Sequence, residues 1–100
     1  MGNEPYRVKE IEFIGYALKR MKRRGISEKD VAGSIKSPDE LLYDVLSRCH
    51  IAVKKTNDKH IIVTYTVTGN KVTVITTFKT SRGKYLISRK ERLGVWIKTE

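Results

Sequence analysis

One hundred residues are enough for a single domain with one hydrophobic core, and 21 Lys and Arg against 11 Asp and Glu give a net charge of +10. The single cysteine, Cys49, excludes an internal disulfide and suits the reducing cytosol. No apolar run approaches the roughly 18 residues of a spanning helix, so a cytoplasmic protein without a membrane partner is predicted. The lack of Gln and the abundance of Lys, Arg and Glu are weakly typical of thermophiles.

A first helix is predicted near the N-terminus. Apolar residues there recur at spacings of three and four, as on one face of a helix: Ile11, Ile14, Leu18 and Met21. Gly25 follows the last turn and suits a helix end. Leu18 and Met21 are therefore expected to anchor this helix to the core.

A second helix is predicted directly after the first. Ser27 suits the N-cap and Asp30 the third helical position, which is a variant of the capping box. Ile26 and Val31 are spaced as a hydrophobic staple. Pro38 ends the segment, because the residue before a proline avoids helical geometry.

The second half of the chain changes to an alternation of period two. Four strands are predicted, at 41–47, 49–55, 60–67 and 71–78. Polar and glycine-containing turns separate the later strands, which indicates an antiparallel meander. The tail at 81–100 is left open between a short helix, an extra strand and a segment ordered by a partner.

One face of each of the last two strands is expected to pack against the helices. These faces consist of Ile61, Val63, Tyr65 and Val67, and of Val72, Val74, Thr76 and Phe78. The predicted fold class is α+β, with two N-terminal helices packed on a four-stranded antiparallel sheet. The whole chain, 1–100, is predicted to be one domain, with a core at about 10–80 and a variable basic tail at 81–100.

The positive charge is unevenly distributed along the chain. Residues 16–25 hold five cations and no acid, whereas 26–47 hold two cations and five acids. Residues 79–98 hold seven cations and one acid. Such an uneven field attracts polyanions, with nucleic acid as the first candidate, although a highly charged surface without a ligand has the same composition.

Several kinds of catalytic site have no signature in the sequence. No Cys/His cluster has zinc-binding spacing, and no phosphate-binding loop or dinucleotide fingerprint is present. Asp39 and Glu40 are assigned to a turn and Asp44 to a strand rather than to a metal site, so no metal and no cofactor are predicted. With few acids and many cations, metal-free chemistry on phosphate remains, with the RNA 2′-hydroxyl as an internal nucleophile.

The run "YALKRMKRRGISEKDVAGSIKSPDELLYD" resembles a family of small uncharacterised domains related to BrnT-type toxins. The strand ending "VTVITTFKT" is similar to the close of that family, so the resemblance covers roughly 13–80. BrnT toxins resemble RelE-like ribonucleases, which implies a RelE-like sheet covered by two helices and a cognate antitoxin as partner. The family's histidine falls on Tyr16 here, while Arg20 and Arg24 match the pattern.

Candidate site residues follow from the charge pattern and from the resemblance. Tyr16, Arg20 and Arg24 form one stripe at spacings of four. Lys79 and Arg82 follow the last strong strand, where RelE-like folds place basic residues over RNA. The catalytic candidates are Tyr16, Arg20, Lys79 and Arg82. The candidates for nucleic-acid binding are Lys19, Arg20, Arg23, Arg24, Lys79, Arg82, Lys84 and Arg89.

The leading hypothesis is an RNA-directed, toxin-like and metal-free endoribonuclease, with DNA or the ribosome as alternative targets. A non-catalytic nucleic-acid-binding protein and a module that binds an acidic partner protein are the other hypotheses. For single residues, a purely structural role is the alternative to a functional one. Tyr85 and Trp96 suit base stacking, or packing in the core or in a dimer. His50 and His60 suit proton transfer, or a position on the surface or at the edge of the core.

Overall fold

The computed structural model describes residues 10–99, which contain three helices and six strands. In chain order they are β1 (Glu10–Phe13), α1 (Gly15–Arg24), α2 (Glu28–Lys36), β2 (Glu40–Asp44), β3 (Cys49–Lys55), β4 (His60–Thr68), β5 (Lys71–Thr80), α3 (Gly83–Arg92) and β6 (Trp96–Lys98). No helix in this range is long and apolar enough to cross a membrane.

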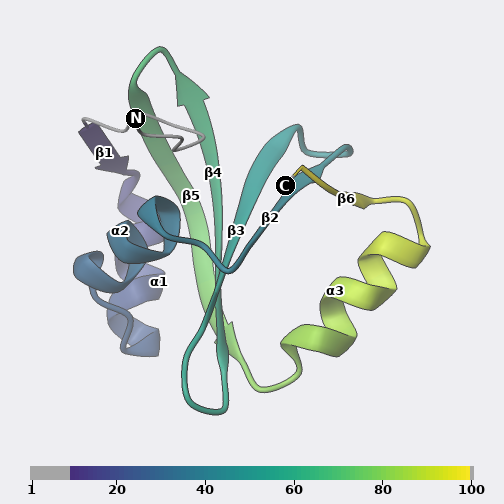
Figure 1. Ribbon diagram of the computed structural model, residues 1–100. Helices are drawn as coiled ribbons and strands as arrows, with labels where there is room; N and C mark the ends of the chain where they lie inside the picture. The colour runs from purple at the N-terminus through teal and green to yellow at the C-terminus, as the bar shows by residue number, and fades with distance from the viewer. Residues whose placement is uncertain (1–9, 100) are drawn as a thin grey trace.

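All six strands belong to one mixed sheet with the order β1-β5-β4-β3-β2-β6. The pairing of β1 with β5 is parallel, and the other pairs are antiparallel. Helices α1 and α2 cover one face of the sheet, and α3 covers the other (Figure 1). The expected RelE-like fold, two N-terminal helices on a four-stranded antiparallel sheet, is therefore wrong.

Two segments at opposite ends of the chain account for this difference. Residues 10–13 alternate in burial as a strand does, and β1 pairs with Lys71–Val74 of β5. Ile11 therefore lies in a strand, although it was expected on the buried face of the first helix. At the other edge, β6 pairs with β2. Both segments are short, so their pairing with distant strands decides their conformation.

Because α1 begins only at Gly15, its buried face is displaced from the expected one. Ala17 and Met21 are buried, whereas Leu18 is 40% exposed, so the role of Leu18 as a core anchor is wrong. The helix ends at Gly25, whose φ of 67° is left-handed and favours glycine. In α2 the predicted capping box is confirmed: Ser27 Oγ accepts from the Asp30 amide at 3.0 Å, and Asp30 Oδ2 accepts from the Ser27 amide at 3.2 Å.

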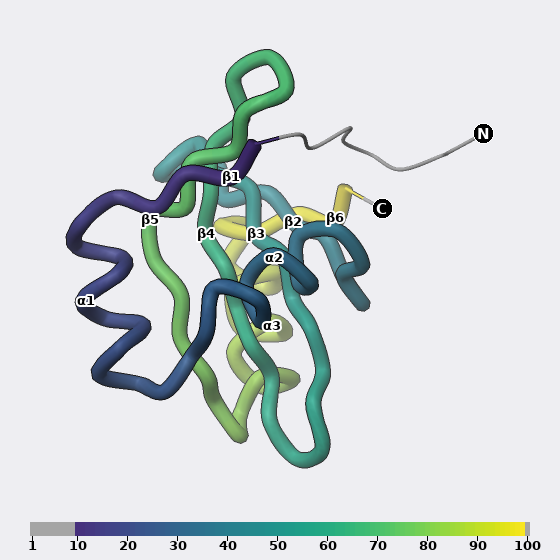
Figure 2. Tube along the Cα trace, turned by 90° about the vertical axis from the view of Figure 1, so that its left-hand side faces the viewer, coloured from purple at the N-terminus to yellow at the C-terminus, as the bar shows by residue number. Residues whose placement is uncertain are grey.

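Buried apolar side chains form one cluster on each face of the sheet. Beneath α1 and α2 the cluster consists of Ala17, Met21, Ile26, Val31, Ile35, Leu41, Ala52, Ile61, Val63, Tyr65, Val72 and Val74. Beneath α3 it consists of Leu42, Ile51, Val53, Ile62, Ile87 and Trp96. Figure 2 shows α1 running alongside β5 while α2 lies closer to the middle of the sheet.

A bulge in β5 changes which side chains face α1. Tyr65 of β4 pairs with Val74, but Thr64 pairs with Thr76, so Ile75 is an extra residue. Val72 and Val74 lie in the cluster under α1 and α2 as expected. Beyond the bulge the alternation is reversed. Phe78 therefore packs against the cluster under α3, and its expected place beneath the N-terminal helices is wrong.

The C-terminal tail is an integral part of the fold. Residues 83–92 form α3, which buries Gly83 and Ile87. Trp96 of β6 is 5% exposed and donates its indole N–H to Asp44 Oδ2 at 3.0 Å. The core-packing interpretation of Trp96 is therefore confirmed, and Cys49 is buried as well.

Candidate functional site

Part of strand β5 forms an open edge of the sheet. β1 pairs only with Lys71–Val74, and within residues 10–99 no other strand pairs with β5 on that side. Residues 75–80 thus leave backbone groups on this side without a partner strand, and proteins commonly protect such edges with charged side chains. Helix α1 lies beside β5 and carries the densest run of cations in the chain.

Two arginines of α1 are held in defined positions beside this edge. Arg24 Nη1 donates to the backbone carbonyl of Thr77 at 2.9 Å, so it occupies one acceptor of the strand. Arg20 lies over the ring of Tyr16, with its guanidinium carbon 4.4 Å from the ring centroid, and donates to the Tyr16 hydroxyl. The contact with a strand carbonyl is thus made by Arg24, whereas the Arg20 guanidinium contacts Tyr16.

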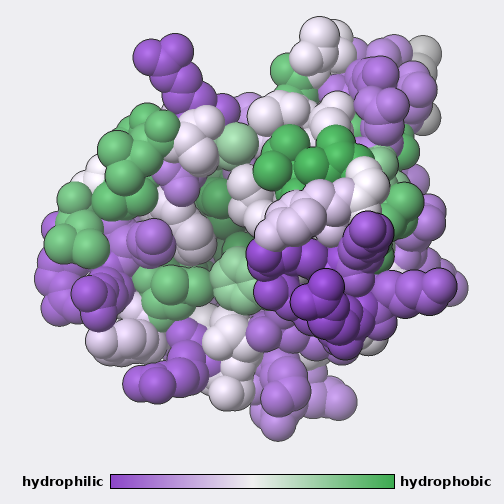
Figure 3. Space-filling model, turned by 180° about the vertical axis from the view of Figure 1, so that it is seen from behind, coloured by the Kyte–Doolittle hydropathy of each residue, from purple (hydrophilic) through white to green (hydrophobic). Residues whose placement is uncertain are grey.

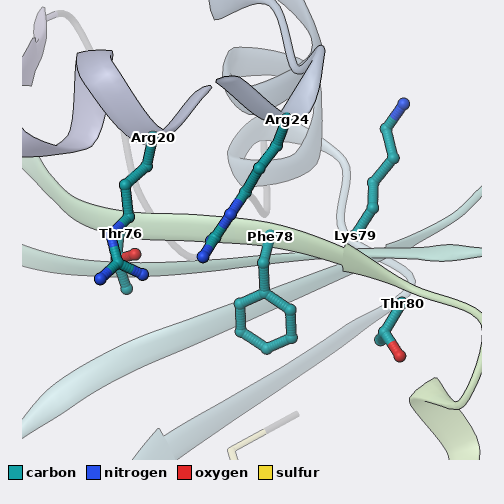
Figure 4. A pocket seen from close by; sticks show the side chains of 6 residues that line it. All are labelled: Arg20, Arg24, Thr76, Phe78, Lys79 and Thr80. Carbon is teal, nitrogen blue, oxygen red and sulfur yellow. The ribbon is translucent and has the colours of Figure 1, made fainter. Parts of the chain in front are cut away.

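These arginines and the end of β5 enclose an open cleft of about 730 Å³, here called the α1–β5 cleft. Its lining residues are Arg20, Arg24, Thr76, Phe78, Lys79 and Thr80. Figure 4 shows the three cations in a row along β5, with Arg24 between Arg20 and Lys79. Because no acid is among the lining residues, the cleft suits an anionic ligand.

The wider surface around the cleft has a similar character. In Figure 3, viewed from behind, strongly hydrophilic side chains gather on the side of α1 and α2. Paler and partly apolar side chains lie next to them. A charged surface beside less polar side chains offers contacts both to phosphates and to the faces of sugars or bases.

The predicted site residues fall into two groups on the molecule. Arg20, Arg24 and Lys79 line the cleft. Tyr16 is not among the lining residues, but its hydroxyl accepts a hydrogen bond from Arg20. Lys19 and Arg23 are exposed on α1 outside the lining. The second group, Arg82, Lys84 and Arg89, is exposed on or next to α3, on the other face of the sheet.

Three lining residues were not identified from the sequence as part of a site. Thr76, Phe78 and Thr80 alternate along β5 and therefore share one side of the strand. Their spacing is visible in the sequence, but Thr76 and Phe78 were expected to pack against the N-terminal helices. The bulge at Ile75, which reverses that assignment, has no distinct sequence signal.

The histidines lie outside the cleft lining. His50 packs between the rings of Tyr43 and Tyr65, at centroid distances of 5.3 and 5.4 Å, and burial lowers its pKa below the usual value. Both ring nitrogens of His60 are buried and make no hydrogen bond within the described part of the chain. His60 lies against Gly83 at the start of α3.

Asp44 has a structural role at the end of β2. Asp44 Oδ1 accepts from the amides of Leu46 and Ser47 at 2.9 and 3.0 Å, and its other oxygen accepts from Trp96. Burial raises the pKa of Asp44, but the hydrogen bonds from Ser47, Trp96 and Leu46 outweigh this and lower it below the usual value. Among residues 10–99, no group of three or more His, Cys, Asp or Glu residues is arranged to hold a metal ion.

Fold and site together define a small α+β domain with a basic cleft at the open edge of a mixed sheet. A family model described as a domain of unknown function, DUF4258, matches residues 16–79, well over half of the chain, and the chain belongs to this family. The comparison with curated proteins found no match, nor did that with solved structures. The expected membership in an uncharacterised domain family is thus confirmed, whereas a relationship to BrnT toxins stays a prediction.

Proposed function

We propose that the protein binds RNA through the α1–β5 cleft, which contacts the sugar-phosphate backbone. The observation that carries this proposal is the row of three cations, Arg20, Arg24 and Lys79, in a cleft whose lining contains no acid. A row along a strand edge suits successive phosphates of an extended backbone better than a single compact anion. The arginines offer planar forks of donors, and Lys79 adds a mobile point charge.

The net charge of +10 supports a polyanion as the ligand, because a field of this size concentrates polyanions near the surface. The polar hydroxyls of Thr76 and Thr80 beside the cations also suit contacts with phosphates and sugars. DNA shares the phosphate chemistry of RNA, and comparison of the two is part of the test.

Metal-free cleavage of RNA is a second candidate function, favoured by the pair of Tyr16 and Arg20. In this reaction the RNA 2′-hydroxyl loses its proton to a base and attacks the adjacent phosphorus. The bond from phosphorus to the 5′-oxygen breaks, and that oxygen takes up a proton. The Tyr16 phenol would transfer one of these protons while Arg20 stabilises the charge that develops on the phosphoryl oxygens. The resemblance to BrnT-type toxins, with Tyr16 in place of histidine, belongs to this candidate, as does a cognate antitoxin.

Salt dependence of binding tests the proposed function. Binding is measured with labelled single-stranded RNA at several salt concentrations. If the protein neutralises about five phosphates, the slope of log K against log salt is about −3.5, and each lost phosphate contact makes the slope shallower by about 0.7. Arg20→Ala and Lys79→Ala should each weaken binding and flatten the slope. Arg23→Ala is the matched control, because Arg23 is exposed on the same helix but does not line the cleft. A slope near zero, or an equal loss in Arg23→Ala, would contradict the proposal.

Cleavage is tested separately with pure protein and RNA, in EDTA and with added Mg²⁺. Tyr16→Phe removes only a hydroxyl and should slow cleavage about 100-fold or more if the phenol transfers a proton. Arg20→Lys keeps the charge but loses the fork, so it should lower the cleavage rate more than the affinity. A wild-type protein that binds RNA through Arg20 and Lys79 without cutting it would be a non-catalytic binding protein.

A further inference from the structure

A second aromatic and basic cluster lies on α3, away from the cleft lining. Tyr85 is 53% exposed, although tyrosine is large and mostly apolar. The Arg82 guanidinium carbon lies 5.2 Å from the centroid of its ring, and Arg89 Nη1 lies 3.5 Å from its hydroxyl oxygen. The three residues are here called the α3 platform.

The α3 platform lies outside the buried cluster beneath α3. The side of α3 that packs on the sheet consists of Gly83 and Ile87, with Leu86 partly buried against the same cluster. Tyr85 lies on the opposite, solvent-facing side, so its ring contributes little to the core. An exposed aromatic ring with one cation over its face and another at its hydroxyl suits a ligand that has both a flat face and negative charge.

The α3 platform is connected directly to the α1–β5 cleft. Thr80 lines the cleft, and its hydroxyl accepts a hydrogen bond from the backbone amide of Arg82 at 3.0 Å. Two residues of chain span at most about 7 Å, so the backbone of Arg82 lies immediately beyond the end of the cleft. Arg82 is therefore the next cation along the chain after Lys79, the last cation of the row.

We propose that the α3 platform is a base-stacking subsite, in which Tyr85 receives an unpaired base while Arg82 and Arg89 contact the flanking phosphates. This inference rests on the proposed RNA binding and specifies its substrate class as single-stranded RNA. Inside a duplex both faces of each base are covered by stacking, whereas an unpaired base can be placed on an aromatic ring. The subsite lies C-terminal to residues 16–79, the part of the chain that the family model matches.

The test compares single-stranded RNA with a blunt duplex of the same length. Tyr85→Leu should weaken single-strand binding about 5- to 150-fold, the range of one base stacked on an aromatic ring. The duplex affinity of this variant should not change, because phosphate contacts dominate there. Tyr85→Phe is the matched control and should bind the single strand as the wild type does. Thermal unfolding of all variants checks that α3 remains folded.

The outcomes separate this inference from the function on which it rests. Normal single-strand affinity in Tyr85→Leu, together with weakened affinity in Arg20→Ala, would overturn the stacking subsite and leave the cleft as the RNA site. Equal losses for single strand and duplex would also overturn it, because stacking on an unpaired base would then not be the cause. A wild-type protein that binds no RNA would overturn both proposals.

Discussion

Replacing Gly83 with alanine tests how closely α3 packs on the sheet. A Cβ atom at Gly83 would lie 2.7 Å from the His60 Cβ and 2.5 Å from its Nδ1, and closer still to its Cγ. Ordinary carbon contacts begin at about 3.5 Å, so the ring or the helix has to move by roughly 1 Å. His60 is held at the start of β4, opposite Thr80, and most of the clashing atoms are at the base of its side chain.

We expect Gly83→Ala to lower the free energy of unfolding by about 1–3 kcal/mol, the usual cost of overpacking. In a domain of this size each kcal/mol shifts Tm by about 4–8 °C, so thermal and urea unfolding both resolve the effect. Gly33→Ala is the matched control. Gly33 lies inside α2, and a Cβ there meets nothing within 4 Å. That substitution should stabilise the protein by about 0.5–1 kcal/mol through helix propensity.

A double mutant identifies the cause of the loss. His60→Ala removes Cγ and Nδ1, so Gly83→Ala should cost less in that background than in the wild type. A Gly83→Ala variant that unfolds with the same Tm as the wild type would refute the close packing. An equal cost in both backgrounds would show that the loss does not come from the His60 ring.

The remaining predictions concern α1 and the response to acid. Met21→Ala should cost about 2–5 kcal/mol, whereas Leu18→Ala, at a 40% exposed residue, should cost about 1 kcal/mol in the same melts. The pKa of Asp44 is lowered in the folded state, so ionised Asp44 stabilises the protein at pH values above its unfolded pKa near 3.9. This stabilisation is lost as the pH falls through the folded pKa. Asp44→Asn should therefore reduce the loss of stability at acid pH in urea unfolding measured over a pH series. The pKa of His50 is likewise lowered by burial, so its contribution is lost as pH falls from about 6.5 toward the folded value, and His50→Phe should remove that dependence in the same series.

Local signals in the sequence were reliable where neighbouring residues alone determine the geometry. The capping box of Ser27 and Asp30 forms as expected, because both partners lie within one helical turn. Gly25 takes the left-handed conformation that ends α1. The alternation of Ile61, Val63 and Tyr65 places all three in one core cluster, because side chains of a regular strand alternate without exception.

Features that depend on distant parts of the chain could not be predicted in this way. Residues 10–13 become a strand because β5 offers them an unpaired edge, and Trp96 becomes part of the core because α3 returns the chain to β2. The bulge at Ile75 moves Phe78 to the other face of the sheet. For β1 and β6, a pairing between segments far apart in sequence outweighs a weak local preference, whereas the bulge lies within the hairpin of β4 and β5 and has no distinct sequence signal.

The candidate site shows the same division. The sequence alone determined that the chain is strongly basic, that its cations gather near α1 and the C-terminus, and that Arg20 and Arg24 share a stripe, because charge and helical spacing are local properties. Only the tertiary structure decided that this stripe lies beside the open end of β5 and that Lys79 completes a row with the arginines. The physical reason is that a cleft is a relation between surfaces. Its lining depends on which strand is left unpaired and on where a helix packs, and both follow from burial of the core as a whole.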